Sequence, residues 1–142
     1  MSPAFSLEEA NGVFLDHFAP WVRDLGFSIT EIRDDGVTMR LPHNADLCRI
    51  GGTLSGQAMM ALADTCMVYS VAAALGGFRD MATASQNTSF FRPVLERDLI
   101  AEGRIMKKGR MLVFGEVVMQ AEGDPRPVAH VTSTYALPPG GG

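Results

Sequence analysis

The chain is organised around the stretch from Ile50 to Gly77, which reads IGGTLSGQAMMALADTCMVYSVAAALGG. Alanine, methionine, leucine and valine fall on almost every side of a helix drawn over residues 56–75, and the only charged side chain in that helix is Asp64. A helix that is apolar nearly all round is normally buried on most of its sides. The stretch therefore predicts a long central helix that the rest of the chain covers.

Composition and charge limit the classes of protein to which the chain can belong. Its 142 residues suit one domain with its own core, and 46% hydrophobic with 20% charged residues is typical of a soluble protein. A net charge of -4 disfavours a nucleic-acid partner, because such partners bind basic surfaces. Cys48 and Cys66 lack the spacing of a metal site. We therefore expect neither a metal centre nor a nucleic-acid partner.

The start of the chain and the apolar helix bear on localisation. Residues 1–10 show no basic segment followed by an apolar run, so we expect no secretory signal and a cytoplasmic protein. Residues 58–75 are long and apolar enough to be considered as a membrane span. Asp64 would then lie near the bilayer centre, at a cost of roughly 2.5 to 3.5 kcal/mol. The sequence therefore favours a helix buried in the core of the protein over a helix that spans a membrane, and we expect no membrane partner.

The rest of the chain predicts one more helix and six strands. Ser6 to Glu9 fits a capping box before a helix over residues 7–18, and Asp34-Asp35-Gly36 predicts a hairpin turn in which glycine supplies a positive φ. We expect strands over residues 27–33, 37–41, 82–91, 98–106, 111–119 and 128–137, and a disordered tail over 138–142. This order indicates a single α+β domain over residues 1–137, with a mostly antiparallel sheet of five to six strands around the long helix.

Two segments carry a resemblance to a known family. The long helix opens with Leu54-Ser55-Gly56-Gln57 and continues through Leu62-Ala63-Asp64-Thr65, so that Asp64 follows Ser55 by nine residues. Residues 83–93, TASQNTSFFRP, end in an aromatic residue, a basic residue and proline. Both segments resemble the hotdog-fold acyl-CoA thioesterases of the PaaI-like type, whose helix opens with His-Gly-Gly and carries Leu-Ala-Asp at the same nine-residue spacing. The resemblance extends from about residue 27 to residue 137.

The resemblance implies a fold, an activity and an assembly. It implies a hotdog fold, hydrolysis of the thioester of a small or medium acyl or aryl group with coenzyme A, a homodimer or dimer of dimers, and no metal or redox cofactor. Asp64 and the Gly56 amide would be catalytic. Thr83 matches a family position that carries serine or threonine near the carboxylate, where its hydroxyl would orient the attacking water; a plain strand residue is the alternative.

Three positions at or before the start of the helix depart from the family pattern. Ser55 stands where the family has histidine, and Gln57 replaces its second glycine. Arg49 occupies the position of an asparagine that often lies six residues before the histidine, a role that Asn44 would take after a rearrangement of the loop. These departures concern groups that orient and polarise the substrate. Asp64 and the Gly56 amide are retained.

Thioester hydrolysis needs a group that stabilises charge on the carbonyl oxygen and a base or nucleophile. The first turn of the long helix offers free backbone N–H groups and roughly half a positive charge from the helix dipole. Gly56 has no side chain to keep a carbonyl away from its N–H. Asp64 can act as a general base toward water or attack the thioester directly. The alternative is a buried Asp64 that neighbouring hydroxyls satisfy without catalysis.

The spacing of Gly56 and Asp64 predicts how the site is assembled. Eight residues at a rise of 1.5 Å place them about 12 Å apart in one straight helix. That distance is too long for both groups to serve one thioester carbonyl. We therefore expect a dimer whose two equivalent sites each combine Gly56 of one subunit with Asp64 of the other.

Ser55 has two further interpretations that involve no thioesterase family. As a nucleophile it would form a triad with His43 and Asp64, but the sequence around it lacks the G-x-S-x-G spacing. As the N-cap of the long helix it would simply accept a hydrogen bond from a backbone N–H. The N-cap interpretation is favoured.

Other polar residues are predicted to contact the substrate. Lys107, Lys108 and Arg110 form a basic hairpin tip that would bind the phosphates of coenzyme A, unless it is only a solvated turn. Asn87 shares a face with Thr83 by the two-residue period of a strand, which would line a cleft or a subunit interface. The predicted substrate-binding residues are Ser55, Gln57, Asn44, Arg49, Asn87, Arg92, Lys107, Lys108 and Arg110.

The main alternative to an enzyme is a hotdog protein that binds acyl-CoA or another small ligand without turning it over. The absence of the family histidine favours that alternative. A hydratase or dehydratase would need a paired histidine and acid near the helix, and the sequence offers none there.

Overall fold

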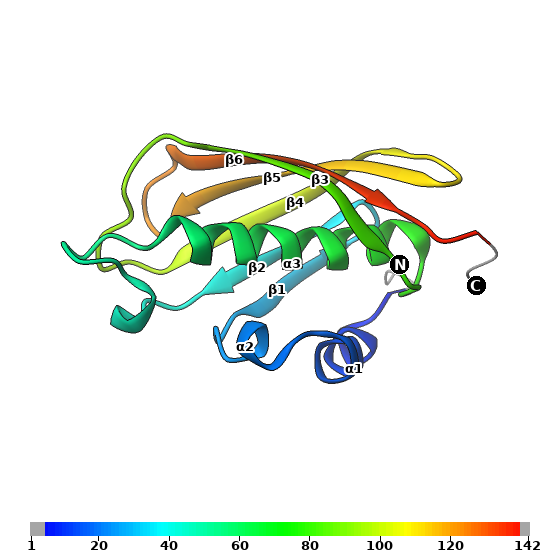
Figure 1. Cartoon of the computed structure of the whole chain (residues 1–142), viewed down its shortest axis with the longest axis horizontal. Coiled ribbons are helices and arrows are strands. Elements are labelled where there is room, and N and C mark those ends of the chain that lie inside the picture. Colours follow the sequence, from blue (N-terminus) through cyan, green and yellow to red (C-terminus); the bar gives the residue numbers. More distant parts are fainter. Residues whose placement is uncertain (1–4, 140–142) are drawn as a thin grey trace.

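The computed structural model describes residues 5–139, which form one sheet around one long helix (Figure 1). The helices are α1 (Leu7–His17), α2 (Pro20–Arg23) and α3 (Gly56–Leu75), with a 3₁₀ helix, η1 (Ala45–Leu47). The strands are β1 (Ser28–Arg33), β2 (Gly36–Leu41), β3 (Ala82–Phe90), β4 (Leu99–Lys108), β5 (Leu112–Ala121) and β6 (Pro127–Ala136). Of the tail expected over 138–142, residues 140–142 lie outside the described part.

All six strands pair antiparallel in the order β1-β2-β4-β5-β6-β3. The sheet curls around α3, which packs mainly against β2 and β4 at its centre, and α1 and α2 lie beyond β1 (Figure 1). β1 and β3, which lie far apart in the sequence, form the two edges. This arrangement is the hotdog fold, so the predicted fold class is confirmed.

The long helix has the ends and the burial that its sequence predicts. Ser55 caps its start, and Gly76 ends it in the left-handed conformation with a φ of 80°. By length and composition α3 could cross a membrane, but 67% of its apolar window is buried inside the fold. That burial agrees with a core helix.

Glycines let α3 and the sheet approach each other closely. A Cβ on Gly103 in β4 would lie 2.3 Å from the Ser70 Oγ and 2.9 Å from the Cys66 Sγ of α3. The prediction of a positive φ at Gly36 is wrong, because that residue already belongs to β2 and is not among the glycines with positive φ. Gly36 is needed for space instead, since its Cβ would lie 2.0 Å from the carbonyl oxygen of Gly103.

Helix α1 is tied to the far end of α3. The Ser6 hydroxyl accepts a hydrogen bond of 3.1 Å from the Glu9 N–H, as the capping box predicts. The Glu9 carboxylate does not return to Ser6 but accepts from the Phe78 N–H at 2.7 Å. α1 ends at His17, one residue earlier than expected.

Candidate active site

Asp64 lies in the middle of α3, with two hydroxyl groups directed at it from the sheet. The Thr83 Oγ1, on edge strand β3, donates to the Asp64 Oδ1 at 2.9 Å. The hydroxyl of Tyr135, on neighbouring strand β6, also donates to Oδ1, and it lies 2.9 Å from the backbone carbonyl oxygen of Asp64. Asp64 is half-buried and Thr83 is exposed. The carboxylate is therefore held firmly in place while one side stays open.

Tyr135 is a residue of this site that the sequence analysis did not identify. It is 1% exposed, and burial raises the pKa of its hydroxyl well above the ordinary value, with the charge of Asp64 as the second cause. The hydroxyl therefore stays protonated and keeps its role as a donor. The available signal was the alternation of β6, which directs Val131, Ser133 and Tyr135 to the core, where a tyrosine hydroxyl needs a partner.

The start of α3 presents backbone donors. The Ser55 Oγ accepts from the Ala58 N–H at 3.2 Å, which confirms the N-cap interpretation. The N–H groups of Gly56 and Gln57 have no acceptor among residues 5–139, as expected for the first turn of a helix. His43 binds Asp98 through its backbone N–H, and no hydrogen bond joins it to Ser55 among residues 5–139. The triad of Ser55, His43 and Asp64 is therefore not assembled in the described chain.

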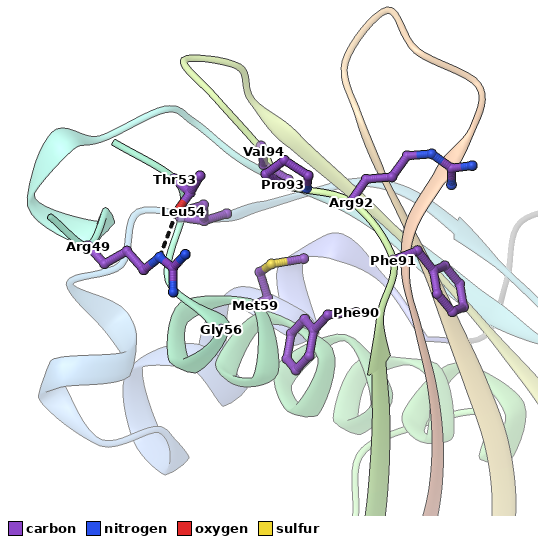
Figure 2. A pocket seen from close by; sticks show the side chains of 10 residues that line it. All are labelled: Arg49, Thr53, Leu54, Gly56, Met59, Phe90, Phe91, Arg92, Pro93 and Val94. Carbon is purple, nitrogen blue, oxygen red and sulfur yellow. Dashed lines mark hydrogen bonds between the residues drawn. The ribbon is translucent and has the colours of Figure 1, made fainter. Parts of the chain in front are cut away.

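An open pocket of about 560 Å³ begins at Gly56 (Figure 2). Arg49 lies on one side, with its Nε donating to the Thr53 Oγ1 at 2.8 Å, and Phe90 from the end of β3 lies on the other. A Cβ on Gly56 would lie 3.3 Å from the Phe90 Cζ. Any side chain at position 56 would therefore press on this ring and narrow the approach to the N–H. The lining residues are Arg49, Thr53, Leu54, Gly56, Met59, Phe90, Phe91, Arg92, Pro93 and Val94.

The two predicted catalytic groups do not meet within one chain. Gly56 and Asp64 belong to the same helix, so their Cα atoms are about 12 Å apart. Asp64 is not among the residues that line the pocket at Gly56. The two groups therefore lie at separate places on one helix.

A β-bulge between Thr83 and Ser85 changes which side chains of β3 face α3. Thr83 pairs with Tyr135, whereas Ser85 pairs with Thr134 and Asn87 with Thr132. The prediction that Asn87 shares a face with Thr83 is therefore wrong, because the extra residue of the bulge reverses the alternation. Gln86 faces α3 instead, and its side-chain amide lies 3.4 Å from the carbonyl oxygen of Met60.

The remaining predicted binding residues lie in three places. Asn44 caps η1 by accepting from the Asp46 N–H at 2.9 Å. Arg92 lines the pocket, but its guanidinium points away from Gly56 and donates to the Pro127 carbonyl (Figure 2). The hairpin over residues 107–111 lies at the opposite end of α3 from Gly56 (Figure 1), where the Lys108 Nζ donates to the carbonyl oxygen of Ala74.

No cluster of metal-ligating side chains occurs among residues 5–139. Cys66 is fully buried, and burial raises the pKa of its thiol to about 12, so it is a packed core residue as expected. The titratable group on the uncovered side of α3 is Asp64.

Known proteins share this fold over most of the chain. A crystal structure from Silicibacter sp. TM1040, described as a candidate thioesterase, is 34% identical, with a TM-score of 0.85 over 98% of this chain and 96% of that one. A candidate esterase of Thermoplasma acidophilum is 25% identical over 119 residues, 80% of this chain and 83% of that protein. The PaaI protein of the E. coli phenylacetic acid degradation operon has a TM-score of 0.80 at 15% identity, over 92% and 95% of the two chains.

The sequence model of one family covers the centre of the fold. The description of that family is the thioesterase superfamily, and the match extends over residues 51–128. These residues include the start of α3, Asp64 and strands β3 to β5. The chain therefore belongs to the thioesterase superfamily.

Proposed function

We propose that this protein hydrolyses acyl-CoA thioesters in active sites shared between two copies of the chain. The observation that carries the proposal is Asp64, held by Thr83 and Tyr135 on an uncovered side of α3, eight residues from free N–H groups on the same helix. A site that uses both groups needs two helices. A small or medium acyl or aryl group and a cytoplasmic location are parts of the same proposal.

One stripe of α3 supports the pairing of two helices. A line of residues at helical spacing on α3 is exposed or only partly buried, with Met60 41% exposed near its start and Asp64 one turn further on. If two α3 helices cross antiparallel near Met60, the Asp64 of one protomer comes level with the partner's Gly56. The stripe consists of Gln57, Met60, Ala61, Asp64, Val68 and Leu75.

The free edge of the sheet supports the same assembly. β3 is exposed along nearly its whole length and carries no charged residue. An uncharged, unpaired edge strand is a template for pairing with another chain. Two copies of β3 running antiparallel would join the sheets and bring the uncovered sides of the two helices together. A dimer of dimers would build on this pair.

The chemistry follows from the two half-sites. The thioester carbonyl accepts a hydrogen bond from the partner's Gly56 N–H, which stabilises the oxyanion as it forms. Asp64 takes a proton from a water that Thr83 orients, the water oxygen bonds to the carbonyl carbon, and the carbon–sulfur bond then breaks to release the carboxylic acid and the CoA thiol. In the nucleophilic variant Asp64 itself attacks, expels the CoA thiolate and forms an anhydride that water cleaves. Neither route needs a metal or redox cofactor.

A second function is a protein that binds acyl-CoA without turnover. The observation that favours it is the N-cap role of Ser55, whose hydroxyl is already engaged by Ala58. Because Ser55 stands where the related thioesterases carry histidine, this site lacks a side chain that would polarise the carbonyl. The binding function would use the same pocket at Gly56.

A panel of acyl-CoA substrates with detection of the free thiol separates the two functions. We expect turnover with at least one member, and a loss of about 10³-fold in kcat for Asp64→Asn with the dimer intact. Asp16→Asn, an exposed aspartate on α1, is the matched control and should leave kcat unchanged. Binding across the panel without thiol release from the wild-type protein would support the binding function instead.

A further inference from the structure

The proposed site leaves the β4–β5 hairpin without a role. We call residues 106–112 the hairpin tip; they are Met106, Lys107, Lys108, Gly109, Arg110, Met111 and Leu112. The Gly109 N–H donates to the Leu112 carbonyl at 2.8 Å, and a Cβ on Gly109 would lie 2.6 Å from that oxygen, so the turn is tight. The hairpin extends past the last turn of α3, at the end of the molecule away from Gly56 (Figure 1). It therefore presents a narrow, convex tip to the surroundings.

The hairpin tip concentrates positive charge on an acidic protein. It carries three cations and no carboxylate, so a net charge of -4 for the whole chain means a net charge of -7 for the rest. The Lys108 Nζ donates to the Ala74 carbonyl at 3.1 Å, near the end of α3. Lys107 and Arg110 are exposed and form no ion pair or side-chain hydrogen bond with any of residues 5–139. Their charges are therefore open to a partner.

Exposed apolar side chains lie among these cations. Met106 is 60% exposed, Met111 52% and Leu112 42%. Phe114, which is 37% exposed, pairs with Lys107 across the hairpin, so the ring and the ammonium group share the outer face of the sheet. Single exposed apolar residues are ordinary, whereas a group of them beside unpaired cations marks an interaction surface.

Acidic groups on the neighbouring elements lie behind the tip. The Ile105 N–H donates to the Asp35 carbonyl at 2.7 Å, which places the acidic β1–β2 turn beside the base of the hairpin. The Asp35 carboxylate faces Arg33, and the carboxylate of Glu116 is paired with Arg104. Four residues of strand, about 13 Å, separate Glu116 from the start of β5. Because charges more than about 8 Å apart are largely screened at physiological ionic strength, a surface that meets the tip meets its cations.

The size and composition of the tip decide which kind of partner fits it. A stable protein interface uses about 20–30 residues on each side. The tip with Phe114 offers eight residues, on a convex turn. A lipid surface needs no matching area, because lysine and arginine bind lipid phosphates while apolar side chains enter the boundary between head groups and acyl chains. Methionine, which is unbranched and flexible, suits such fluid surroundings. The tip therefore favours an anionic lipid surface over a protein partner.

We propose that the hairpin tip docks this protein on the surface of a membrane that contains anionic lipid. Lys107 and Arg110 contact lipid phosphates, and Met106, Met111 and Leu112 enter the boundary below them. This inference goes beyond the proposed function and does not depend on it. It differs from the expectation of no membrane partner, which was based on α3. The contact is made at the surface, and α3 stays in the core of the fold.

Co-sedimentation with lipid vesicles tests the charge of the tip. The vesicles contain phosphatidylcholine alone or phosphatidylcholine mixed with anionic phosphatidylglycerol. We expect binding to the mixed vesicles that weakens as the salt concentration rises, and little binding to the neutral ones. Each cation near an anionic surface strengthens binding roughly fivefold, so Lys107→Gln combined with Arg110→Gln should weaken it about twentyfold. Arg104→Gln is the matched control, because it removes a charge from the same strand behind the tip, and it should not change binding.

A second pair of variants tests the apolar part of the tip. Met111→Ser removes an exposed apolar side chain and keeps every charge, and it should weaken binding to the mixed vesicles about fivefold. Leu15→Ser is the control, because Leu15 is 66% exposed on α1, and it should have no effect. Dependence on Met111 separates lipid from free phosphate or an acidic protein, because those partners offer charge without an apolar layer.

Three results would overturn the membrane surface. The first is no binding to the mixed vesicles, or equal binding to both kinds. The second is vesicle binding that depends on Lys107 and Arg110 but not on Met111. The third is binding of adenosine 3′,5′-bisphosphate or of soluble polyglutamate that the double variant weakens, in a protein that does not bind vesicles; bisphosphate would assign the tip to coenzyme A and polyglutamate to an acidic protein. No readout requires turnover, so failure of the proposed hydrolase leaves the test intact.

Discussion

The two edges of the sheet are both exposed strands, but their sequences differ in one respect. β1, SITEIR, carries Glu31 and Arg33, which form an ion pair with each other. β3, ATASQNTSF, carries no charge over nine residues. Charged side chains on an edge strand discourage another strand from pairing with it, and β3 lacks that protection. The chain therefore has one closed edge and one edge suited to pairing.

The edge suited to pairing is also the edge that builds the candidate site. Thr83, near the start of β3, donates to Asp64, and Phe90, at its end, lies over Gly56. β1 contributes to neither half-site. In the proposed function, assembly and catalysis both depend on β3. A change on β3 should therefore affect both properties, and a matched change on β1 should affect neither.

The largest effect is expected from placing a charge on β3. Ser85 is exposed near the middle of this strand. In a two-fold symmetric contact between two β3 strands, a substitution at this position is present on both chains, so two added positive charges would lie close together. Ser85→Lys should convert the dimer to monomers and abolish thioester hydrolysis with it. Ser28→Lys places the same charge on the exposed start of β1. It should change neither the oligomeric state nor the rate of thioester hydrolysis. Sedimentation and activity on the same samples measure both properties; an active monomer of Ser85→Lys would refute the link between assembly and catalysis.

The second prediction distinguishes two effects of a substitution at Gly56, the loss of its N–H donor and the loss of space around it. Gly56 is the first residue of α3, where proline is well tolerated, and Ser55 before it already has the extended backbone that proline requires. Gly56→Pro removes only the donor from the backbone and should lower kcat by about 10²- to 10³-fold. Gly56→Ala adds a similar contact with Phe90 but keeps the N–H. A kcat that falls equally in both variants would assign the effect to crowding.

A smaller effect is expected from the buried hydroxyl behind Asp64. Tyr135→Phe removes one of the two donors to the carboxylate and should lower kcat by about tenfold, with little change in KM. Tyr69→Phe is the control, because Tyr69 is equally buried but its hydroxyl binds the Ala10 carbonyl. Since burial raises the pKa of Tyr135, the wild-type kcat should not fall as pH rises through 10, where an ordinary tyrosine ionises.

The sequence predicted those features of the fold that depend on local pattern. Residues 56–75 are apolar on nearly all sides, and Ser55 and Gly76 mark the ends of α3 by capping chemistry that acts within a few residues. The strands alternate clearly enough to be placed within one or two residues. Asp64 and Gly56 were identified because their spacing on one helix is visible in the sequence and matches a known family.

The features that the sequence did not predict depend on contacts between distant segments. Gly36 is glycine because β4 passes within 2.0 Å of where its Cβ would be, and nothing near position 36 records that contact. The bulge after Thr83 reverses the alternation on which the placement of Asn87 was based. Tyr135 was missed because its partner, Asp64, is 71 residues away in the chain.

A mixing experiment tests most directly whether the site is shared between two chains. Asp64→Asn and Gly56→Pro proteins, each inactive as a homodimer, are dissociated and reassociated in equal amounts. A shared site predicts that the mixed dimer regains one intact site, from the Gly56 of one chain and the Asp64 of the other, so that activity recovers to roughly one quarter of the wild-type value. No recovery, with mixed dimers shown to be present, would contradict the shared site.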